Sequence, residues 1–180
     1  MKREAVHSAN PRLDRGIPRE VAADLAIAVE SPLQDDVRGL IAELNEVLLG
    51  LTPAEFCYHL KPEEMAVANV TVFVARIGGR AVAMGALRRI GAVGEVKRMY
   101  TRPEFQGQGI GGRILAAIAA TARGEGLAEL VLETGDRHPA AWRVYERAGF
   151  SRCGPVLDYP DTPYSVFYRK RLAPEFPTPA

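Results

Sequence analysis

A glycine-rich turn between a strand and a helix limits what this chain can fold into more than any other feature. A strand is expected at Val93–Thr101, and apolar residues share one helical face across Gly109–Glu125. The turn between them has four glycines within six positions: Gly107, Gly109, Gly111 and Gly112. Glycines let a ligand approach the main chain, and the first N–H groups of a helix have no partner inside it. Together with the helix dipole, these groups predict an anion site, most naturally for a diphosphate.

Two other nucleotide-binding motifs fit this turn less well. A P-loop needs Gly-Lys followed by Ser or Thr at the helix start, and here Gly112 is followed by Arg113. Gly107, Gly109 and Gly112 match the spacing of the dinucleotide-binding G-x-G-x-x-G, and Glu133 lies where a ribose-binding acid could sit. That fingerprint usually joins a parallel strand directly to its helix, near the start of a βαβ unit. Here three strands that we expect to be antiparallel come first.

The remaining pattern predicts a mixed α/β fold. Before the turn we expect a strand at Leu25–Glu30, an amphipathic helix opened by Ser31-Pro32 and ended by Gly50 and Pro53, a helix at Thr52–Leu60, a helical turn at Pro62–Ala66, and strands at Val70–Ile77 and Ala81–Ile90. After it we expect a strand at Leu127–Glu133, a helix at Pro139–Ala148, and strands at Phe150–Val156 and Tyr164–Arg171. The order predicts a mostly antiparallel central sheet of six to seven strands with helices on both faces.

Length and composition indicate one domain. The chain has 180 residues, which we divide into a flexible leader at 1–20, a single domain at 21–173 and a loose tail at 174–180. No apolar run approaches the length of a membrane span, and the first residues lack the apolar core of a signal peptide, so a cytoplasmic protein is expected. A net charge of +1 gives no indication of a nucleic-acid or membrane partner. Cys57 and Cys153 suggest reduced thiols, and no metal site is expected.

Two segments resemble a known family. Gln106, Gly109 and Gly111 fit Gln/Arg-x-x-Gly-x-Gly/Ala, which is motif A of the GNAT superfamily (GCN5-related N-acetyltransferases). At the expected distance, Ala141–Phe150 resembles the family's A-x-x-x-Y-x-x-x-G-F segment. The resemblance spans about Val70 to Leu172. It implies a GNAT-like fold and acetyl-CoA as the co-substrate.

The resemblance also implies roles for individual residues. The diphosphate would be held by main-chain amides of Gln108, Gly109, Ile110, Gly111 and Gly112, with Gln106, Gly107 and Arg113 nearby. The pantetheine arm would pair with the main chain of Met99, Tyr100 and Thr101. Tyr145 would be the general acid that protonates the departing thiolate. His138 stands where the family often has an asparagine that contacts the cofactor.

Transfer to an amine also needs a base. An alkyl ammonium has no lone pair and a pKa of about 10.4 in water, so a carboxylate must take its proton directly or through water. Glu95 is the expected base, although a purely salt-bridged role for this glutamate fits the sequence equally well. Glu133 and Asp136 are weaker candidates. Neither cysteine lies in a nucleophile setting, so direct transfer is expected.

Two functions are compatible with this pattern. The first is an N-acetyltransferase that acts on the primary amine of a small-molecule or amino-acid-like acceptor. The alternative is a non-catalytic acyl-CoA-binding or regulatory module on the same scaffold. Tyr145 and Glu95 favour the enzyme. Trp142 is expected to be structural, and Asp158, Tyr159 and Asp161 are expected on a surface loop, Pro155–Pro163. A homodimer that pairs the final strands is also compatible with the sequence.

Overall fold

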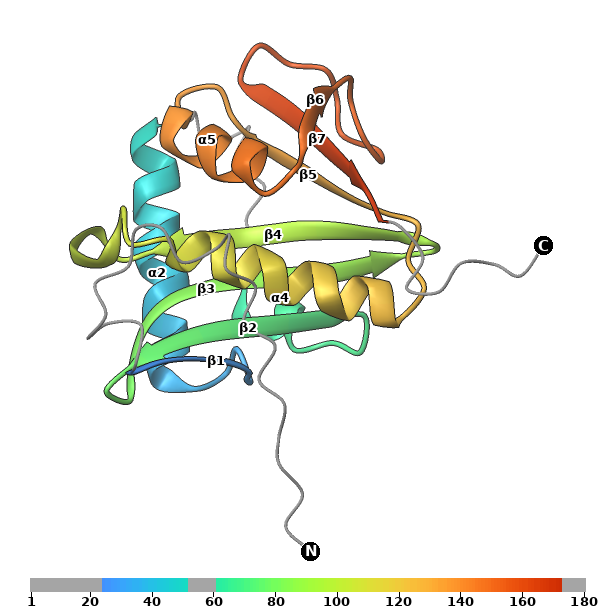
Figure 1. Ribbon diagram of the computed structural model, residues 1–180. Helices are drawn as coiled ribbons and strands as arrows, with labels where there is room; N and C mark the ends of the chain where they lie inside the picture. Colours follow the sequence, from blue (N-terminus) through green and yellow to red (C-terminus); the bar gives the residue numbers. More distant parts are fainter. Residues whose placement is uncertain (1–23, 52–60, 173–180) are drawn as a thin grey trace, which may run out of the picture.

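A seven-stranded sheet runs through the protein in the computed structural model (Figure 1). The structure describes residues 24–51 and 61–172. The strand order is β1-β2-β3-β4-β5-β7-β6, and β4 with β5 is the one parallel pair among the described strands. The predicted mixed, mostly antiparallel sheet is therefore confirmed.

The elements follow the predicted order closely. Their bounds are β1 (Leu25–Val29), α2 (Asp35–Leu51), α3 (Pro62–Met65), β2 (Val70–Ile77), β3 (Arg80–Ile90), β4 (Val93–Thr101), the 3-10 turn η2 (Pro103–Phe105), α4 (Ile110–Gly124), β5 (Glu129–Gly135), α5 (Pro139–Arg147), β6 (Ser151–Cys153) and β7 (Ser165–Arg171). The helix predicted at Thr52–Leu60, the leader at 1–20 and the tail at 174–180 lie outside the described residues, as do Cys57 and both ends of the proposed domain.

Two elements are shorter than predicted. Ser31 starts a turn rather than a helix, because its hydroxyl accepts a hydrogen bond from the N–H of Leu33 at 3.2 Å. Helix α2 begins at Asp35, so two acids occupy the first turn, where the helix dipole favours them. Strand β6 ends at Cys153 because Pro155 soon follows, and proline has no N–H to donate to the neighbouring strand.

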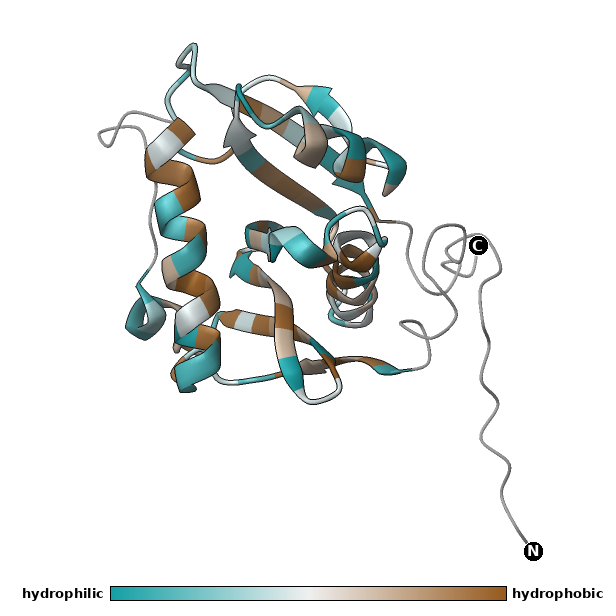
Figure 2. Cartoon of the chain, turned by 90° about the vertical axis from the view of Figure 1, so that its left-hand side faces the viewer, coloured by the Kyte–Doolittle hydropathy of each residue, from teal (hydrophilic) through white to brown (hydrophobic). Residues whose placement is uncertain are grey.

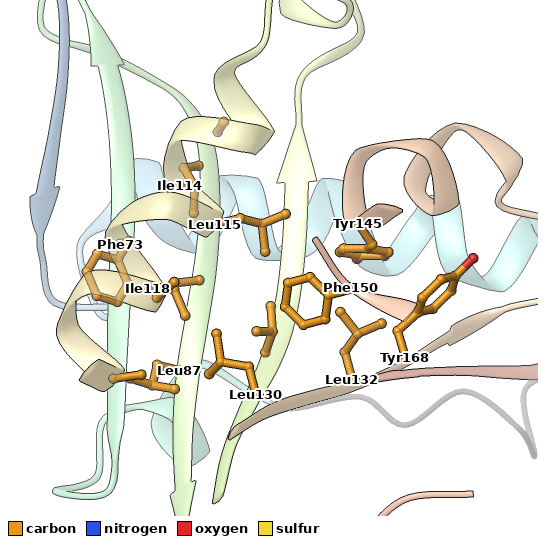
Figure 3. Packing of buried hydrophobic residues seen from close by; sticks show 14 of the residues in the cluster. Phe73, Leu87, Ile114, Leu115, Ile118, Leu130, Leu132, Tyr145, Phe150 and Tyr168 are labelled. Carbon is orange, nitrogen blue, oxygen red and sulfur yellow. The ribbon is translucent and has the colours of Figure 1, made fainter. Parts of the chain in front are cut away.

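Helices cover both faces of the sheet. Figure 2 shows α2 and α4 on opposite sides of it. On the α4 side, apolar side chains of α4 pack over β2, β3 and β5 (Figure 3); the labelled ones include Ile114, Leu115, Ile118, Phe73, Leu87 and Leu130. On the α2 side, a second core joins α2 to β2 and β3; it includes Leu40, Ile41, Leu44, Val72, Val74 and Met84. The sheet is thus buried from both sides, as the order of strands and helices predicted.

The parallel strands β4 and β5 separate soon after they meet. Their pairing covers only Val93–Glu95 of β4 and Glu129–Val131 of β5. Beyond it, β4 continues along β3, while β5 continues along β7. The two halves of the sheet therefore diverge at its centre.

A β-bulge in β4 lies just past this point. Lys97 pairs with Ala86 and Tyr100 pairs with Met84, so Arg98 and Met99 together oppose the single residue Gly85. Arg98 has a φ of 57°, which is unusual for a residue with a side chain. Bulges bend a strand and redirect its side chains, and here the bend comes where β4 leaves β5.

Candidate active site

A cavity of about 740 Å³ opens where β4 and β5 separate. It is bounded by Lys97–Thr101 of β4, by the glycine-rich loop and first turn of α4, and by Glu133–Gly135 at the end of β5. Helix α5 contributes Val144 and Tyr145. On the other face of the sheet, α2 contributes Leu44, Val47, Leu48 and Leu51. The cavity therefore extends from the start of α4 to α2.

The glycine-rich loop has main-chain donors without a backbone acceptor beside this cavity. Gly107 and Gly109 both have a φ of 76°, and Gly109 is the left-handed N-cap of α4. The first hydrogen bond of the helix joins the N–H of Arg113 to the carbonyl of Gly109 at 3.2 Å. Within residues 24–51 and 61–172, the N–H groups from Gln108 to Gly112 have no backbone acceptor. A row of unbonded donors at a helix start is the arrangement that binds phosphate groups.

The predicted pantetheine strand also borders the cavity. Met99, Tyr100 and Thr101 line it, and Gln106 Nε2 donates to the Thr101 carbonyl at 3.0 Å. This bond fixes the glycine-rich loop to the end of β4. Beyond Glu95, β4 has a strand partner on its β3 side alone among the described strands. Its other edge is free to pair with an extended ligand.

Tyr145 lies between α5 and the core (Figure 3). Its ring packs against Phe150 and Tyr168, with centroid distances of 6.1 and 5.9 Å. Burial, with a smaller effect from the charge of Glu133, raises the pKa of Tyr145 above its ordinary value. The phenol is therefore neutral at physiological pH and can donate a proton into the cavity that it lines.

The model of the Acetyltransferase (GNAT) family matches residues 37–150. This chain belongs to the GNAT family. An IAA acetyltransferase from Azospirillum brasilense is 40% identical to it over 151 residues, which is 83% of this chain and 99% of that protein. An acyl-CoA N-acyltransferase structure from Klebsiella pneumoniae has 32% identity and a TM-score of 0.71, covering 84% of this chain and 99% of that one.

A third relative shares the fold. The structure of PaiA N-acetyltransferase from Thermoplasma acidophilum in complex with coenzyme A has 15% identity and a TM-score of 0.63, covering 81% of this chain and 99% of that one. The two relatives of 30% identity or more carry acyltransferase names, so this GNAT protein is an acyltransferase enzyme. Both the family resemblance and the GNAT fold are therefore confirmed. No helix in the described part of the chain is long and apolar enough to cross a membrane.

Most of the predicted cofactor residues line the cavity of this GNAT protein. Those that do are Met99, Tyr100, Thr101, Gln106, Gly107, Gly109, Ile110, Gly111, Gly112 and His138. Among the described lining residues, Gln108 and Arg113 are missing. Gln108 Nε2 instead donates to the Glu104 carbonyl at 3.3 Å, and this bond ties the loop to the 3-10 turn η2.

His138 and Trp142 lie at opposite ends of the first turn of α5. His138 is the N-cap of α5, and its Nε2 is buried without a hydrogen-bond partner in the described residues. Burial lowers the pKa of His138, so the imidazole is neutral near pH 7 and can donate to a ligand. Trp142 Nε1 donates to the Gly135 carbonyl at 3.1 Å, which ties α5 to the end of β5. The structural role expected for Trp142 agrees with this bond.

Glu95 is buried in a cluster of polar side chains. It is 1% exposed, and its Oε1 accepts hydrogen bonds from Tyr159 at 2.6 Å and from Lys97 at 3.3 Å. Arg88 lies 3.5 Å from the other oxygen. Lys97 lines the cavity, whereas Glu95 is not among the described lining residues. Glu95 is therefore connected to the cavity through Lys97 and does not border it directly.

The loop at Pro155–Pro163 is not simply a surface loop. Asp158 and Asp161 are exposed, as expected. Tyr159 instead reaches inward from this loop to hydrogen-bond Glu95 and to pack against Phe167 at a centroid distance of 6.2 Å. The hydroxyl of Tyr159 is also bonded to Lys97. The surface position expected for Tyr159 is thus wrong, because its ring covers the polar cluster on β4.

Glu133 is the one carboxylate among the described residues that line the cavity. It lies on β5, and burial raises its pKa, an effect opposed by a hydrogen bond from Ser165 and by the charge of Lys97. A raised pKa suits a group that must take up a proton near neutral pH. Asp136, the other candidate, is not among the described lining residues. Its Oδ1 is buried and has no hydrogen-bond partner in the described part of the chain.

Arg98 is the buried charged residue among the described lining residues that the sequence analysis missed. It lines the cavity from the bulge in β4, and its Nη2 donates to Asn45 Oδ1 on α2. The consecutive charges Lys97 and Arg98 could have indicated it. Alternation in a strand would point such neighbours to opposite faces, so two charges in a row inside a buried strand suggest an irregularity.

Proposed function

We propose that this protein transfers an acetyl group from acetyl-CoA directly to the primary amine of a small, amino-acid-like acceptor. The observation that carries the proposal is the row of unbonded N–H groups from Gln108 to Gly112, at one end of a cavity that Tyr145 also lines. Acetyl is the proposed acyl group because a relative of 40% identity is named an acetyltransferase.

The chain has the groups that coenzyme A needs. The N–H groups from Gln108 to Gly112 would hold the diphosphate, because a helix start offers both free donors and a favourable dipole. The free edge of β4 at Met99–Thr101 would pair with the amides of the pantetheine arm. His138 Nε2, which is buried and without a partner in the described chain, offers one more donor beside them.

The chemistry requires three proton transfers. Acetyl-CoA supplies an electrophilic thioester carbonyl. A carboxylate of the protein removes a proton from the acceptor ammonium, which frees the nitrogen lone pair. The new bond joins this nitrogen to the carbonyl carbon, the carbon–sulfur bond breaks, and Tyr145 gives its proton to the sulfur. The nitrogen gives up its second proton, which restores the Tyr145 phenol through water, and the carboxylate releases the first proton to solvent. No acyl-enzyme forms in this scheme.

Two carboxylates are candidates for the base. Glu95 was expected from the sequence, but it already accepts hydrogen bonds from Tyr159 and Lys97. Glu133 borders the cavity, and burial has raised its pKa. We therefore favour Glu133, with Glu95 holding Lys97 and Tyr159 in position.

The proposal includes the setting in which the enzyme works. We propose a cytoplasmic protein that needs no metal, nucleic acid or membrane. Cys153 is a free thiol, which suits a reducing compartment. A homodimer that pairs the final strands would use β6, because β7 lies inside the sheet between β5 and β6.

A thiol-release assay tests the proposal. Acetyl-CoA and the protein should release free coenzyme A with a panel of small primary amines, and mass spectrometry should find the acetylated amine. Calorimetry should find tight binding of coenzyme A in the same samples. Tight binding without turnover on any amine would instead favour the non-catalytic module.

A further inference from the structure

The bulge in β4 places a guanidinium on the α2 side of the cavity. Arg98 and Met99 share the space opposite Gly85, and Arg98 donates from Nη2 to Asn45 on α2. Helix α2 covers the sheet face opposite α4 (Figure 2). Arg98 therefore lies across the sheet from the glycine-rich loop that is proposed to hold the diphosphate.

The charge of Arg98 is not balanced by the described part of the chain. Arg98 is 7% exposed, and no described carboxylate lies within 4.0 Å of it. Its Nε and Nη1 are buried and have no hydrogen-bond partner there. Burial lowers the pKa of Arg98 to about 10, so it still carries its charge at neutral pH. A buried charge without a counter-ion is costly, and proteins keep one where a ligand supplies the opposite charge.

The wall around Arg98 is apolar. Leu44, Val47, Leu48 and Leu51 line the same cavity from α2, the helix that also carries the Arg98 partner Asn45. The nearest basic neighbour on β4, Lys97, is already engaged by Glu95 and Tyr159. A ligand at this end therefore meets the buried, uncompensated guanidinium of Arg98 beside a set of aliphatic side chains. Arg137, Arg143 and Arg147 also line the cavity, but they are exposed and come from α5 and the turn before it.

We propose that the acceptor amine carries a carboxylate that binds Arg98 and an apolar group that packs on α2. This inference rests on the proposed acetyl transfer and names its acceptor class, the amino acids with aliphatic or aromatic side chains. A small turn of the guanidinium into the cavity presents its N–H donors to the carboxylate. One guanidinium with an aliphatic wall suits a singly charged group better than a phosphate, which needs more donors.

Matched substrates test the inference without any mutation. Leucine and phenylalanine are compared with leucinamide and phenylalaninamide, which keep the amine and side chain but lack the negative charge. The acids should have kcat/KM about 10- to 100-fold above the amides, as expected for a charge-assisted hydrogen bond in a buried site. Equal or higher values for the amides would overturn the inference while leaving acetyl transfer intact.

Variants of Arg98 test the residue itself. Arg98→Met should lower kcat/KM for the acids about 10- to 100-fold and leave the amides nearly unchanged, so that the preference disappears. Arg98→Lys should keep part of it. Arg169→Met is the matched control. Arg169 on β7 forms an ion pair with Glu129 on β5 and is not among the described residues that line the cavity. It should retain the full preference.

A binding measurement separates this inference from the proposed function. Calorimetry of leucine and leucinamide binding to the protein saturated with coenzyme A needs no turnover. Leucine binding that Arg98→Met abolishes would support the carboxylate site even if no amine were acetylated. Turnover of both substrates at rates that Arg98→Met changes equally, or a preference for a phosphorylated amine, would overturn it. If Arg98→Met does not fold, the Arg98→Lys data and the wild-type preference decide.

Discussion

The side chain of Met99 occupies the space that a Cβ atom on Gly85 would need. A Cβ built on Gly85 would overlap the Met99 sulfur and lie 2.8 Å from Cγ2 of Ile114 on α4. The two residues face each other across the bulge, where Arg98 and Met99 oppose Gly85. A residue without a side chain on β3 therefore permits the bend by which β4 leaves β5.

Gly85→Ala should destabilise the fold. The added methyl group must displace Met99 or Ile114 in a close-packed core, which costs about 1–3 kcal/mol of unfolding free energy. Urea denaturation measures the loss. Gly39→Ala is the control, because a Cβ on Gly39 in α2 meets nothing within 4 Å. This substitution should raise the unfolding free energy by about 0.5–1 kcal/mol. Equal stability of Gly85→Ala and wild type would contradict the role given to Gly85.

Gly109→Ala should weaken coenzyme A binding. Gly109 has a φ of 76°, and an alanine there strains the N-cap and displaces the neighbouring N–H groups. Loss of one charge-assisted hydrogen bond raises Kd about tenfold or more in calorimetry. Gly126→Ala is a matched control, because Gly126 has a φ of 75° at the other end of α4. Both variants should lose similar stability, so only Gly109→Ala should lose affinity for coenzyme A. Similar Kd values for the two variants would contradict the assignment of the loop to the cofactor site.

Tyr145→Phe should lower kcat about 100-fold, because the thiolate then has no positioned proton donor. Coenzyme A affinity should be nearly unchanged. Tyr168→Phe is the control: its hydroxyl bonds Glu146 and Arg152 beside Tyr145, so its loss should cost about 1 kcal/mol of stability with little change in kcat. A kcat for Tyr145→Phe within about twofold of wild type would exclude Tyr145 as the acid.

The pH dependence of the reaction should identify the base. Burial raises the pKa of Glu133, so its carboxyl is protonated, and unable to act as a base, at pH values where an ordinary glutamate is ionised. The rate kcat/KM should therefore fall as pH drops through this raised pKa, which lies above the usual 4.5. Glu133→Gln should be slow at every pH and should not show this fall, the acidic limb of the pH profile. Glu95→Gln should retain it; if Glu95→Gln loses the limb instead, Glu95 is the base.

Local patterns were sufficient to predict the glycine-rich loop and most strands and helices. The turn glycines, the amphipathic face of α2 and the apolar strands are all set by neighbours in sequence. Strand β6 was overestimated because Phe150 and Val156 are buried, although only Ser151–Cys153 pair with β7. Burial and strand pairing differ there because of the proline that follows.

The proposed acceptor side of the cavity could not be predicted, because it depends on contacts between distant residues. Arg98 faces α2 only because Gly85 on another strand allows a bulge, and it meets Asn45, which is 53 residues away. Tyr159 reaches Glu95 across 64 residues from a loop that looks like ordinary surface. The consecutive charges Lys97 and Arg98 indicate an irregular strand, but no pattern in the sequence identifies the partners Asn45 and Glu95.

The separation of β4 from β5 has an evolutionary consequence. The proposed diphosphate grip belongs to α4 on one side of the sheet, whereas the apolar wall belongs to α2 on the other. Mutations along α2 can therefore retune selectivity for the nucleophile while the docking of the thioester donor stays constant. A library randomised at Leu44, Val47, Leu48 and Leu51 is a direct route to enzymes with new amine preferences.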